Sequence, residues 1–304
     1  MEPRSTQVLL RKIIDPGAAK NSFDYLRSKS MQPEQIEVNG IPVSYVDYGG
    51  GEPVVFVHGA VSDLRVWEPI RESIANHHRF VAPTLRYFGA GEWPDKGGRF
   101  SVATHADDIA AFIQALDLGR VHLVGWSYGG NIATAVALEH PDVVRSLILF
   151  EPAITSMIKE GAAGDAAREA QGKMLGPVTA AVEEGDAENA TILLIEGVFQ
   201  LPPGGFSGQP PEIQAIQLDN ARTMPLLWST DLGGVTSDML GALDRPTLIV
   251  CGSESNAFWP HVANTMEECL PEAEVTMQPG VNHDGPVRDP TGLAAIIKDF
   301  VAKH

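Results

Sequence analysis

The chain has 304 residues, 44% of them hydrophobic, which is enough for one large folded domain carrying an insertion and excludes a largely disordered chain. Its formal net charge of −17 disfavours binding to nucleic acid or to an anionic membrane surface. The two cysteines show no metal spacing, no apolar leader is visible, and no stretch reaches about 18 apolar residues. We therefore predict a cytoplasmic protein with a small-molecule substrate, and the oligomeric state is left open.

Residues 1–35 are predicted to be an N-terminal extension that is more basic than the rest of the chain. Its basic residues are Arg4, Arg11, Lys12, Lys20, Arg27 and Lys29. We expect an arm that is poorly ordered, or helical and packed on the domain. A targeting arm is the alternative.

From Ile36 the sequence predicts strands alternating with helices. Residues 36–48 fit a hairpin that turns at Asn39-Gly40, a favourable turn dipeptide. Short apolar runs, typical of strands buried on both faces, lie at 54–57, 80–82, 121–124, 147–150 and 247–250, with a weaker one at 274–277. Apolar residues at helical spacing occupy 64–76, 102–116, 131–139 and 293–301. This alternation predicts an α/β fold with a mostly parallel sheet covered on both faces.

The alternation stops between 152 and 236. This span contains alanine-rich helical stretches and a loop rich in proline and glycine at 201–211. Because it lies between two predicted strands of the sheet, we interpret it as a helical cap, or lid, inserted after the sixth strand. The core is then formed by residues 36–151 and 237–304.

The most specific motif is Gly125-Trp126-Ser127-Tyr128-Gly129-Gly130, which follows the run at 121–124 and precedes a helix. It fits the G-x-S-x-G nucleophile elbow in its strand–turn–helix context. The sharp turn strains the backbone at the serine, and side chains two positions away on either side would collide with neighbouring elements. We predict that Ser127 is the nucleophile, placed at a helix N-terminus that favours developing negative charge.

A second motif, His58-Gly59-Ala60, directly follows the run at 54–57. With the elbow, it makes the chain from about Ile36 onward resemble the α/β-hydrolase superfamily. The resemblance implies an oxyanion hole made by the backbone N–H groups of Ala60 and Tyr128, worth a few kcal/mol to the transition state. His58 itself is expected to fix the turn.

The general base is predicted to be His283. It lies between the last predicted strand and the last helix, in Pro279-Gly280-Val281-Asn282-His283-Asp284-Gly285-Pro286, which is similar to the family's catalytic-histidine loop. It also satisfies the chain order nucleophile, acid, histidine. Of the other histidines, His261 is the one modest competitor.

The chain departs from the family pattern in two places. The segment after the fourth strand, residues 84–91, keeps the family's arginine as Arg86 and its glycines, but lacks the usual aspartate and serine. We expect this loop to be structural, although Tyr87 and Phe88 could line a pocket. In addition, Ser255 occupies the position at which the family usually carries the triad acid.

Three carboxylates compete for the role of the acid. Some family members carry the acid at the end of the strand before the cap, and in this chain that position is Glu151, which we favour. Glu254 is the alternative, one residue before the usual position. Asp284 adjoins His283, and chain neighbours rarely point at each other's ring nitrogens.

These residues predict a serine hydrolase that cleaves a carboxylic ester or lactone through an acyl-enzyme, with no metal and no organic cofactor. A serine elbow argues against the branches that attack through an aspartate. Within enzymes, a carbon–carbon bond hydrolase or a cofactor-free oxygenase on the same triad remains open, as does a small-ligand receptor that retains the triad. Candidate pocket residues are Trp126, Met157, Phe199, Phe206 and Trp228, with Leu201 and Met224 as further apolar groups of the cap.

Overall fold

The computed structural model describes residues 32–304 except 94 and 233. The predicted basic arm at 1–31 therefore lies outside the described residues. Residues 33–304 form one compact unit, and its first strand begins at Glu34, two residues before the predicted start of the core.

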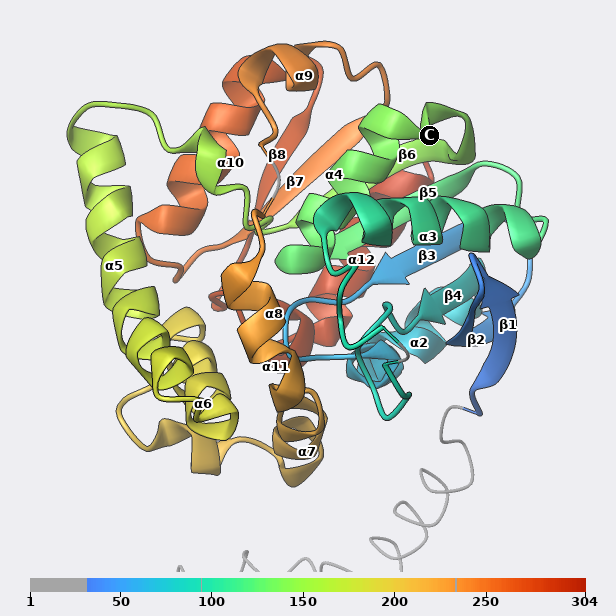
Figure 1. The fold of residues 1–304 in the computed structure, drawn as a ribbon. Coiled ribbons are helices and arrows are strands. Elements are labelled where there is room, and N and C mark those ends of the chain that lie inside the picture. The colour runs from blue at the N-terminus through green and yellow to red at the C-terminus, as the bar shows by residue number, and fades with distance from the viewer. Residues whose placement is uncertain (1–31, 94, 233) are drawn as a thin grey trace, which may run out of the picture. The chain divides into compact units, whose positions relative to one another are not determined.

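Within the described residues, eight strands form one sheet in the order β1-β2-β4-β3-β5-β6-β7-β8 (Figure 1). The first two pairings, β1 with β2 and β2 with β4, are antiparallel, and the remaining ones are parallel. The strands are β1 (Glu34–Val38), β2 (Ile41–Gly49), β3 (Pro53–Val57), β4 (Arg79–Pro83), β5 (Val121–Trp126), β6 (Val144–Phe150), β7 (Thr247–Gly252) and β8 (Glu274–Gln278). The mostly parallel sheet is as predicted.

Burial along the strands explains why some were easier to recognise in the sequence. The interior strands β5 and β7 are buried along their whole length, and most of their side chains are apolar or small. Strand β8 pairs with β7 at the edge of the sheet and is half-exposed, which accounts for its weaker apolar pattern.

Helices cover both faces of the sheet. The longer helices of the core are α2 (Glu68–Ala75), α3 (Val102–Ala115), α4 (Tyr128–Glu139), α10 (Phe258–Cys269) and α12 (Pro290–Val301). Helices α3 and α4 pack on each other over one face, and α2 packs on α12 over the other (Figure 1). Shorter elements are η1 (Leu64–Trp67), η2 (Pro141–Val143), α9 (Ser237–Gly241) and α11 (Gly285–Arg288).

The segment between β6 and α9 is helical, as predicted for the cap. It contains η3 (Thr155–Met157), α5 (Ala162–Glu183), α6 (Ala187–Val198), η4 (Gly205–Gly208), α7 (Pro211–Asp219), η5 (Ala221–Thr223) and α8 (Met224–Ser229). These helices gather to one side of the sheet, at the left and lower part of Figure 1. The cap helices thus follow the sixth strand, and the chain returns to the core with α9, whose N-cap is Thr236.

The N-terminal hairpin and the loop after β4 are both joined to α3 through Asp108. Asn39 and Gly40 adopt positive φ angles of 48° and 74° at the turn, as a two-residue hairpin loop requires. Asn39 donates to Asp108 Oδ1 at 2.9 Å, and Arg86 makes a bidentate pair with the same carboxylate at 2.6 and 2.7 Å. Arg86 therefore holds the loop at 84–91 against α3, which agrees with a structural role.

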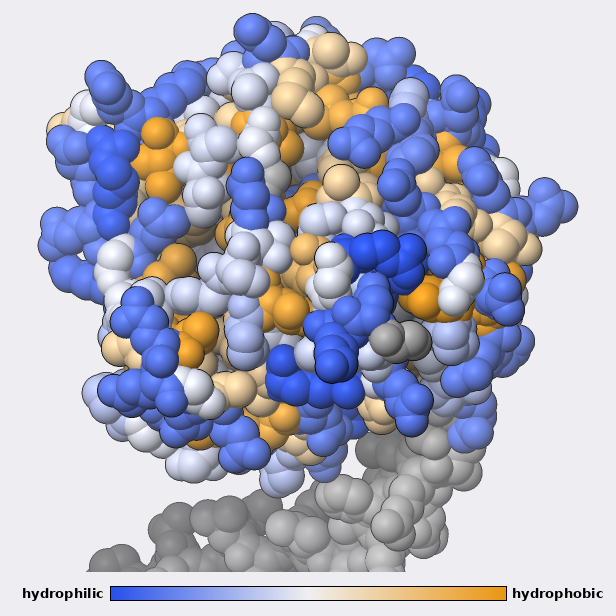
Figure 2. Space-filling model, in the orientation of Figure 1, coloured by the Kyte–Doolittle hydropathy of each residue, from blue (hydrophilic) through white to orange (hydrophobic). Residues whose placement is uncertain are grey.

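The surface in Figure 2 is mixed, with hydrophobic residues scattered among hydrophilic ones. In the part of the chain that the structure describes, no helix combines the length and the apolar character needed to cross a bilayer.

Candidate active site

Ser127 lies at the sharp turn between β5 and α4. Its backbone angles, φ 56° and ψ −120°, fall where a non-glycine residue is strained, at a cost of about 1–3 kcal/mol. Neighbouring backbone fixes this conformation, because Ser127 N donates to Phe150 O of the adjacent strand at 3.0 Å and Gly130 N donates to Ser127 O at 2.8 Å. The turn places the serine at the first turn of α4, where free N–H groups point outward.

The glycines of the elbow are required by space. A β-carbon on Gly125 would collide with Gly129 O, and one on Gly129 would collide with the carbonyl oxygens of Val57 and His58. A β-carbon on Gly130 would lie 2.8 Å from Pro152 Cβ. The turn can therefore pack between β3 and the start of the cap only if these positions lack side chains.

His283 and Glu151 face each other across the carboxyl ends of the strands. Nδ1 of His283 lies 2.8 Å from Glu151 Oε2, and both side chains are almost fully buried. The carboxylate can only accept, so Nδ1 carries the proton and donates. In the neutral ring, this tautomer makes Nε2 of His283 the hydrogen-bond acceptor.

The second oxygen of Glu151 is surrounded by donors. Oε1 accepts from Gly252 N at 2.8 Å, from the Cys251 thiol at 3.2 Å and from the hydroxyl of Ser255. With His283, these donors replace the water that a buried carboxylate loses. Burial, and then the nearby Glu151 carboxylate, raise the pKa of Cys251, so the thiol stays protonated and donates.

Glu151 owes its direction to an unusual backbone. It directly follows β6 with a φ of 44°, in the left-handed region, and its N–H donates to Val250 O of β7 at 3.0 Å. The strain of this conformation is offset because the carboxylate reaches four donors at the sheet edge. Ser255, in the position where the family usually carries its acid, supplies one of those donors.

The competing carboxylates are directed elsewhere. Glu254 is exposed and pairs with Arg288 at 3.2 Å. Asp284 pairs with the same guanidinium at 2.8 Å. The structure therefore places Glu151, and neither alternative, against Nδ1 of His283.

His58 holds the turn that carries Ala60. Leu85 N donates to its Nε2 at 3.1 Å, so Nδ1 carries the proton and donates to Gly59 O at 2.8 Å. Burial lowers the pKa of His58 to about 4, which keeps the ring neutral. Tyr128, which carries the other expected oxyanion donor, begins α4 and bonds through its hydroxyl to His105 Nδ1 at 2.9 Å.

Ser127, His283 and Ala60 line one small cavity of about 50 Å³. The cap contributes most of the remaining wall through Leu194, Ile195, Val198, Phe199, Ile213, Ile216 and Gln217. Trp126 and Phe199, two of the predicted pocket residues, also line it. The carbonyl of Phe199 accepts from Asn282 Nδ2 at 2.8 Å, which ties the cap to the histidine loop.

The structure does not bring the other predicted pocket residues to this cavity. Met157 and Phe206 are buried elsewhere in the inserted segment. The indole of Trp228 donates to Thr179 Oγ1 at 3.0 Å, between two cap helices. Phe206 and Trp228 thus pack against the cap's own elements, whereas η3, which carries Met157, contacts α10 of the core.

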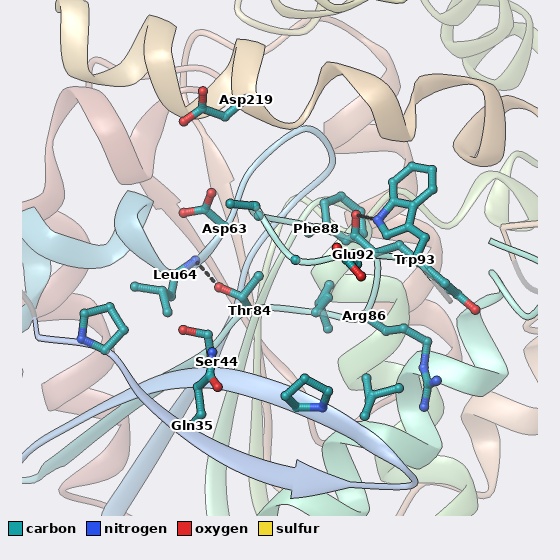
Figure 3. A pocket seen from close by; sticks show the side chains of 18 of the residues that line it. Gln35, Ser44, Asp63, Leu64, Thr84, Arg86, Phe88, Glu92, Trp93 and Asp219 are labelled. Carbon is teal, nitrogen blue, oxygen red and sulfur yellow. Dashed lines mark hydrogen bonds between the residues drawn. The ribbon is translucent and has the colours of Figure 1, made fainter. Parts of the chain in front are cut away.

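A larger hollow of about 680 Å³ lies beside the loop that follows β4 (Figure 3). Asp63, Thr84, Phe88, Trp93 and Asp219 are among the residues around it. Tyr87 and Phe88 therefore line this hollow and not the cavity of Ser127. It contains neither Ser127 nor His283 in its wall and is not the site of the proposed chemistry.

One surface group of side chains has the donors that could hold a metal ion. Among the residues that the structure describes, the one cluster with metal-ligand side chains is Asp107, Glu139 and His140. His140 Nε2 already lies 2.8 Å from Asp107 Oδ1, which joins the C-terminal end of α4 to the middle of α3 at the surface.

Two residues of the site were not assigned a role from the sequence. Ser255 was recognised by its position, but not as a donor to the acid. Trp259, at the second position of α10, was not singled out, although its ring contacts His283. The sequence does place an aromatic residue shortly after β7. Because the carboxyl ends of the strands meet at the site, this position could have indicated that Trp259 lies near His283.

Comparison with known proteins agrees with the fold. A family model for the alpha/beta hydrolase fold matches residues 52–287. A 2-(acetamidomethylene)succinate hydrolase from Mesorhizobium japonicum is 28% identical over 261 residues, which cover 82% of this chain and 87% of that protein. A 2-hydroxy-6-oxo-2,4-heptadienoate hydrolase from Pseudomonas putida is 36% identical over 114 residues, covering 36% of this chain and 41% of that protein, less than half its length. The crystal structure of the esterase RhEst1 from Rhodococcus sp. ECU1013 superposes with a TM-score of 0.71 at 24% identity, over 90% of this chain and 98% of that one. The chain therefore belongs to the α/β-hydrolase fold family.

Proposed function

We propose that this protein hydrolyses a carboxylic ester or lactone with Ser127 as nucleophile, His283 as general base and Glu151 as the acid of the triad. The observation that carries the proposal is the 2.8 Å contact between Glu151 Oε2 and His283 Nδ1, beside a cavity shared by His283 and Ser127. A purely structural pairing would not require the strained serine turn at the same place.

In the proposed reaction, Ser127 Oγ attacks the acyl carbon while its proton passes to Nε2 of His283. Glu151 holds the other ring nitrogen and stabilises the imidazolium that forms. The N–H groups of Ala60 and Tyr128 bind the tetrahedral oxygen. His283 returns the proton to the leaving alcohol, and a water activated by the same ring then hydrolyses the acyl-enzyme.

The cavity wall favours a small and neutral substrate. Its volume of about 50 Å³ leaves little room for a long acyl chain without movement of the cap. Most of its wall is apolar, and no lysine or arginine occurs among the described residues that line it. A substrate carboxylate in this cavity would lose its hydration without gaining a fixed cation.

Hydrolysis of a carbon–carbon bond on the same triad is the second candidate. It is favoured by the 36% identity with a protein named for 2-hydroxy-6-oxo-2,4-heptadienoate, over the part of the chain that matches. That compound carries a carboxylate, for which the described cavity wall offers no lysine or arginine. We therefore rank the neutral ester or lactone first.

A substrate panel with a matched variant tests the proposal. Wild type and Ser127→Ala are assayed on short aryl esters, lactones and 2-hydroxy-6-oxo-2,4-heptadienoate. We expect ester or lactone turnover that falls on the order of 10⁶-fold in kcat in the variant, because the triad acts as a unit. A fluorophosphonate probe should label wild type at Ser127 alone.

Other outcomes would contradict the proposal. Turnover of the heptadienoate without ester cleavage would establish the second candidate. A fully active Ser127→Ala variant, or labelling at another serine, would remove Ser127 as nucleophile. Thermal stabilisation by ligands without any product would favour a receptor that retains the triad.

A further inference from the structure

Trp259 lies flat on the imidazole of His283. The two ring centroids are 3.8 Å apart and the ring planes differ by 9°. Trp259 belongs to the first turn of α10, after β7, and its side chain is buried. Phe258, the residue before it, lies edge-on to the indole, with ring centroids 4.7 Å apart.

Further aromatic rings approach the same imidazole. Trp126 lies 5.8 Å away at 44°, and Phe199 from the cap lies 6.4 Å away at 54°. The indole N–H of Trp126 donates to His283 O at 3.1 Å and holds the histidine backbone. Because His283 is only 2% exposed, these rings replace most of the water around it.

The N–H of the Trp259 indole does not explain why an indole stands at this position. Trp259 Nε1 is buried and has no hydrogen-bond partner among the described residues. An unpaired buried donor is costly, and a phenylalanine would fill much of the same space without that cost. The stacking on His283 therefore directs attention to the π face of the indole.

That property is attraction of a cation. The face of an aromatic ring is electrostatically negative, and tryptophan attracts a nearby cation more strongly than phenylalanine or tyrosine does. His283 becomes a cation only when it takes the proton of the nucleophile. The charged groups that face it are the Glu151 carboxylate at the end of β6 and, on its own loop, Asp284, which is paired with Arg288 of α11.

We propose that Trp259 is a positioning residue that fixes the plane of the His283 ring and stabilises the imidazolium formed during attack. This inference rests on the proposed function, in which His283 is the general base. Glu151 fixes the ring through one nitrogen, and Trp259 fixes it through its face. Together they leave the imidazole one orientation, with Nε2 free.

The test compares Trp259→Leu, Trp259→Phe and a matched control, Phe258→Leu, which removes a buried neighbouring ring that packs on Trp259. The rate of fluorophosphonate labelling at Ser127 and kcat/KM for an aryl ester are measured against pH. We expect Trp259→Leu to lose about tenfold or more at the plateau, with the acid limb of both profiles moved to lower pH by about half to one unit. The acid limb moves to lower pH because the variant lacks a ring that favours the protonated imidazole, so the imidazole is protonated only at lower pH.

Trp259→Phe should keep most of the rate and show a smaller shift in the same direction, which preserves the test if the leucine variant does not fold. Phe258→Leu should leave the acid limb in place. A Trp259→Leu variant that folds and keeps the wild-type acid limb would overturn the proposal, because the indole would then act by packing alone.

An NMR titration of the His283 ring protons separates this inference from the proposed function. The midpoint of that titration should be lower in Trp259→Leu than in wild type even if no ester is turned over. Wild type that is inert toward every ester and toward the fluorophosphonate would overturn the proposed function. An unchanged midpoint in the variant would overturn the role of Trp259.

Discussion

At the scale of single residues, the site depends on two strained positions that lie side by side. Ser127 and Glu151 both adopt positive φ angles, each directly after a buried strand, and the two strands are neighbours in the sheet. Each unusual backbone turns a functional side chain toward the carboxyl edge of the sheet. Strain of this kind persists where surrounding hydrogen bonds determine the conformation, as they do for both residues here.

The identity of the acid is tested by Glu151→Gln beside Glu254→Gln. We expect Glu151→Gln to lower kcat by about 10⁴-fold, because the amide no longer stabilises the imidazolium and can hold the wrong tautomer. Glu254 pairs with Arg288 at the surface, so its replacement should cost less than about threefold. Both variants are assayed on one ester under identical conditions, and equal losses would refute the assignment.

At the scale of elements, the groups proposed for catalysis come from the core, and much of the cavity wall comes from the inserted helices. Ser127, Glu151 and His283 follow strands β5, β6 and β8, whereas Leu194 and Phe199 come from α6 and the residue after it. If the proposed function holds, we expect the core to keep one chemistry and the cap to set the size of the acyl group. Asn282 links the two parts through its bond to Phe199 O.

Two adjacent leucines of α6 test this division of roles. Leu194 lines the cavity, whereas Leu193 does not. Leu194→Ala should raise kcat/KM for esters with longer acyl chains relative to kcat/KM for short ones. We expect this ratio to rise about fourfold for each additional methylene that the cavity accommodates, because each buried methylene contributes about 0.8 kcal/mol. Leu193→Ala is the control and should leave the ratio unchanged. Labelling of Ser127 by a small fluorophosphonate should be similar in both, and an unchanged acyl preference in Leu194→Ala would contradict the role of the cap.

At the scale of the whole molecule, three buried histidines link stability to pH. Burial lowers the pKa values of His58, His105 and His122 to about 4 in the folded protein, from an ordinary value of 6.5. Between these values the unfolded chain binds protons that the folded protein does not. The free energy of unfolding must therefore fall as the pH is lowered through this range.

Urea unfolding at pH 7, 6 and 5 should show this loss. Each such histidine contributes about 1.4 kcal/mol per pH unit once the unfolded chain is protonated. Replacing His105 by Gln should lower the slope of the free energy of unfolding against pH by about 1.4 kcal/mol per pH unit, the contribution of one histidine. This change in slope is expected whatever the substitution does to stability at pH 7. A slope that is the same in wild type and variant would show that carboxylates, and not these rings, dominate the dependence.

The sequence by itself determined the features that depend on neighbours in the chain. Buried strands need continuous apolar runs, the elbow needs glycines at fixed positions around Ser127, and the hairpin needs Asn39-Gly40. Local spacing therefore predicted the sheet, the helical insertion after the sixth strand and Ser127, and the resemblance to the α/β-hydrolase superfamily added His283 and Glu151. The position of Glu151 at the end of a central strand was enough to favour it over Glu254.

The tertiary structure decided what depends on contacts between distant segments. Met157, Phe206 and Trp228 looked as suitable for the pocket as Phe199, because an apolar residue of a cap helix can face either the cap's own core or the site. How α6 and α7 dock on the core selects which face lines the cavity, and no local pattern records that docking. The stacking of Trp259 on His283 and the bond from Ser255 to Glu151 likewise join segments that meet only when β6, β7 and β8 lie side by side in the sheet.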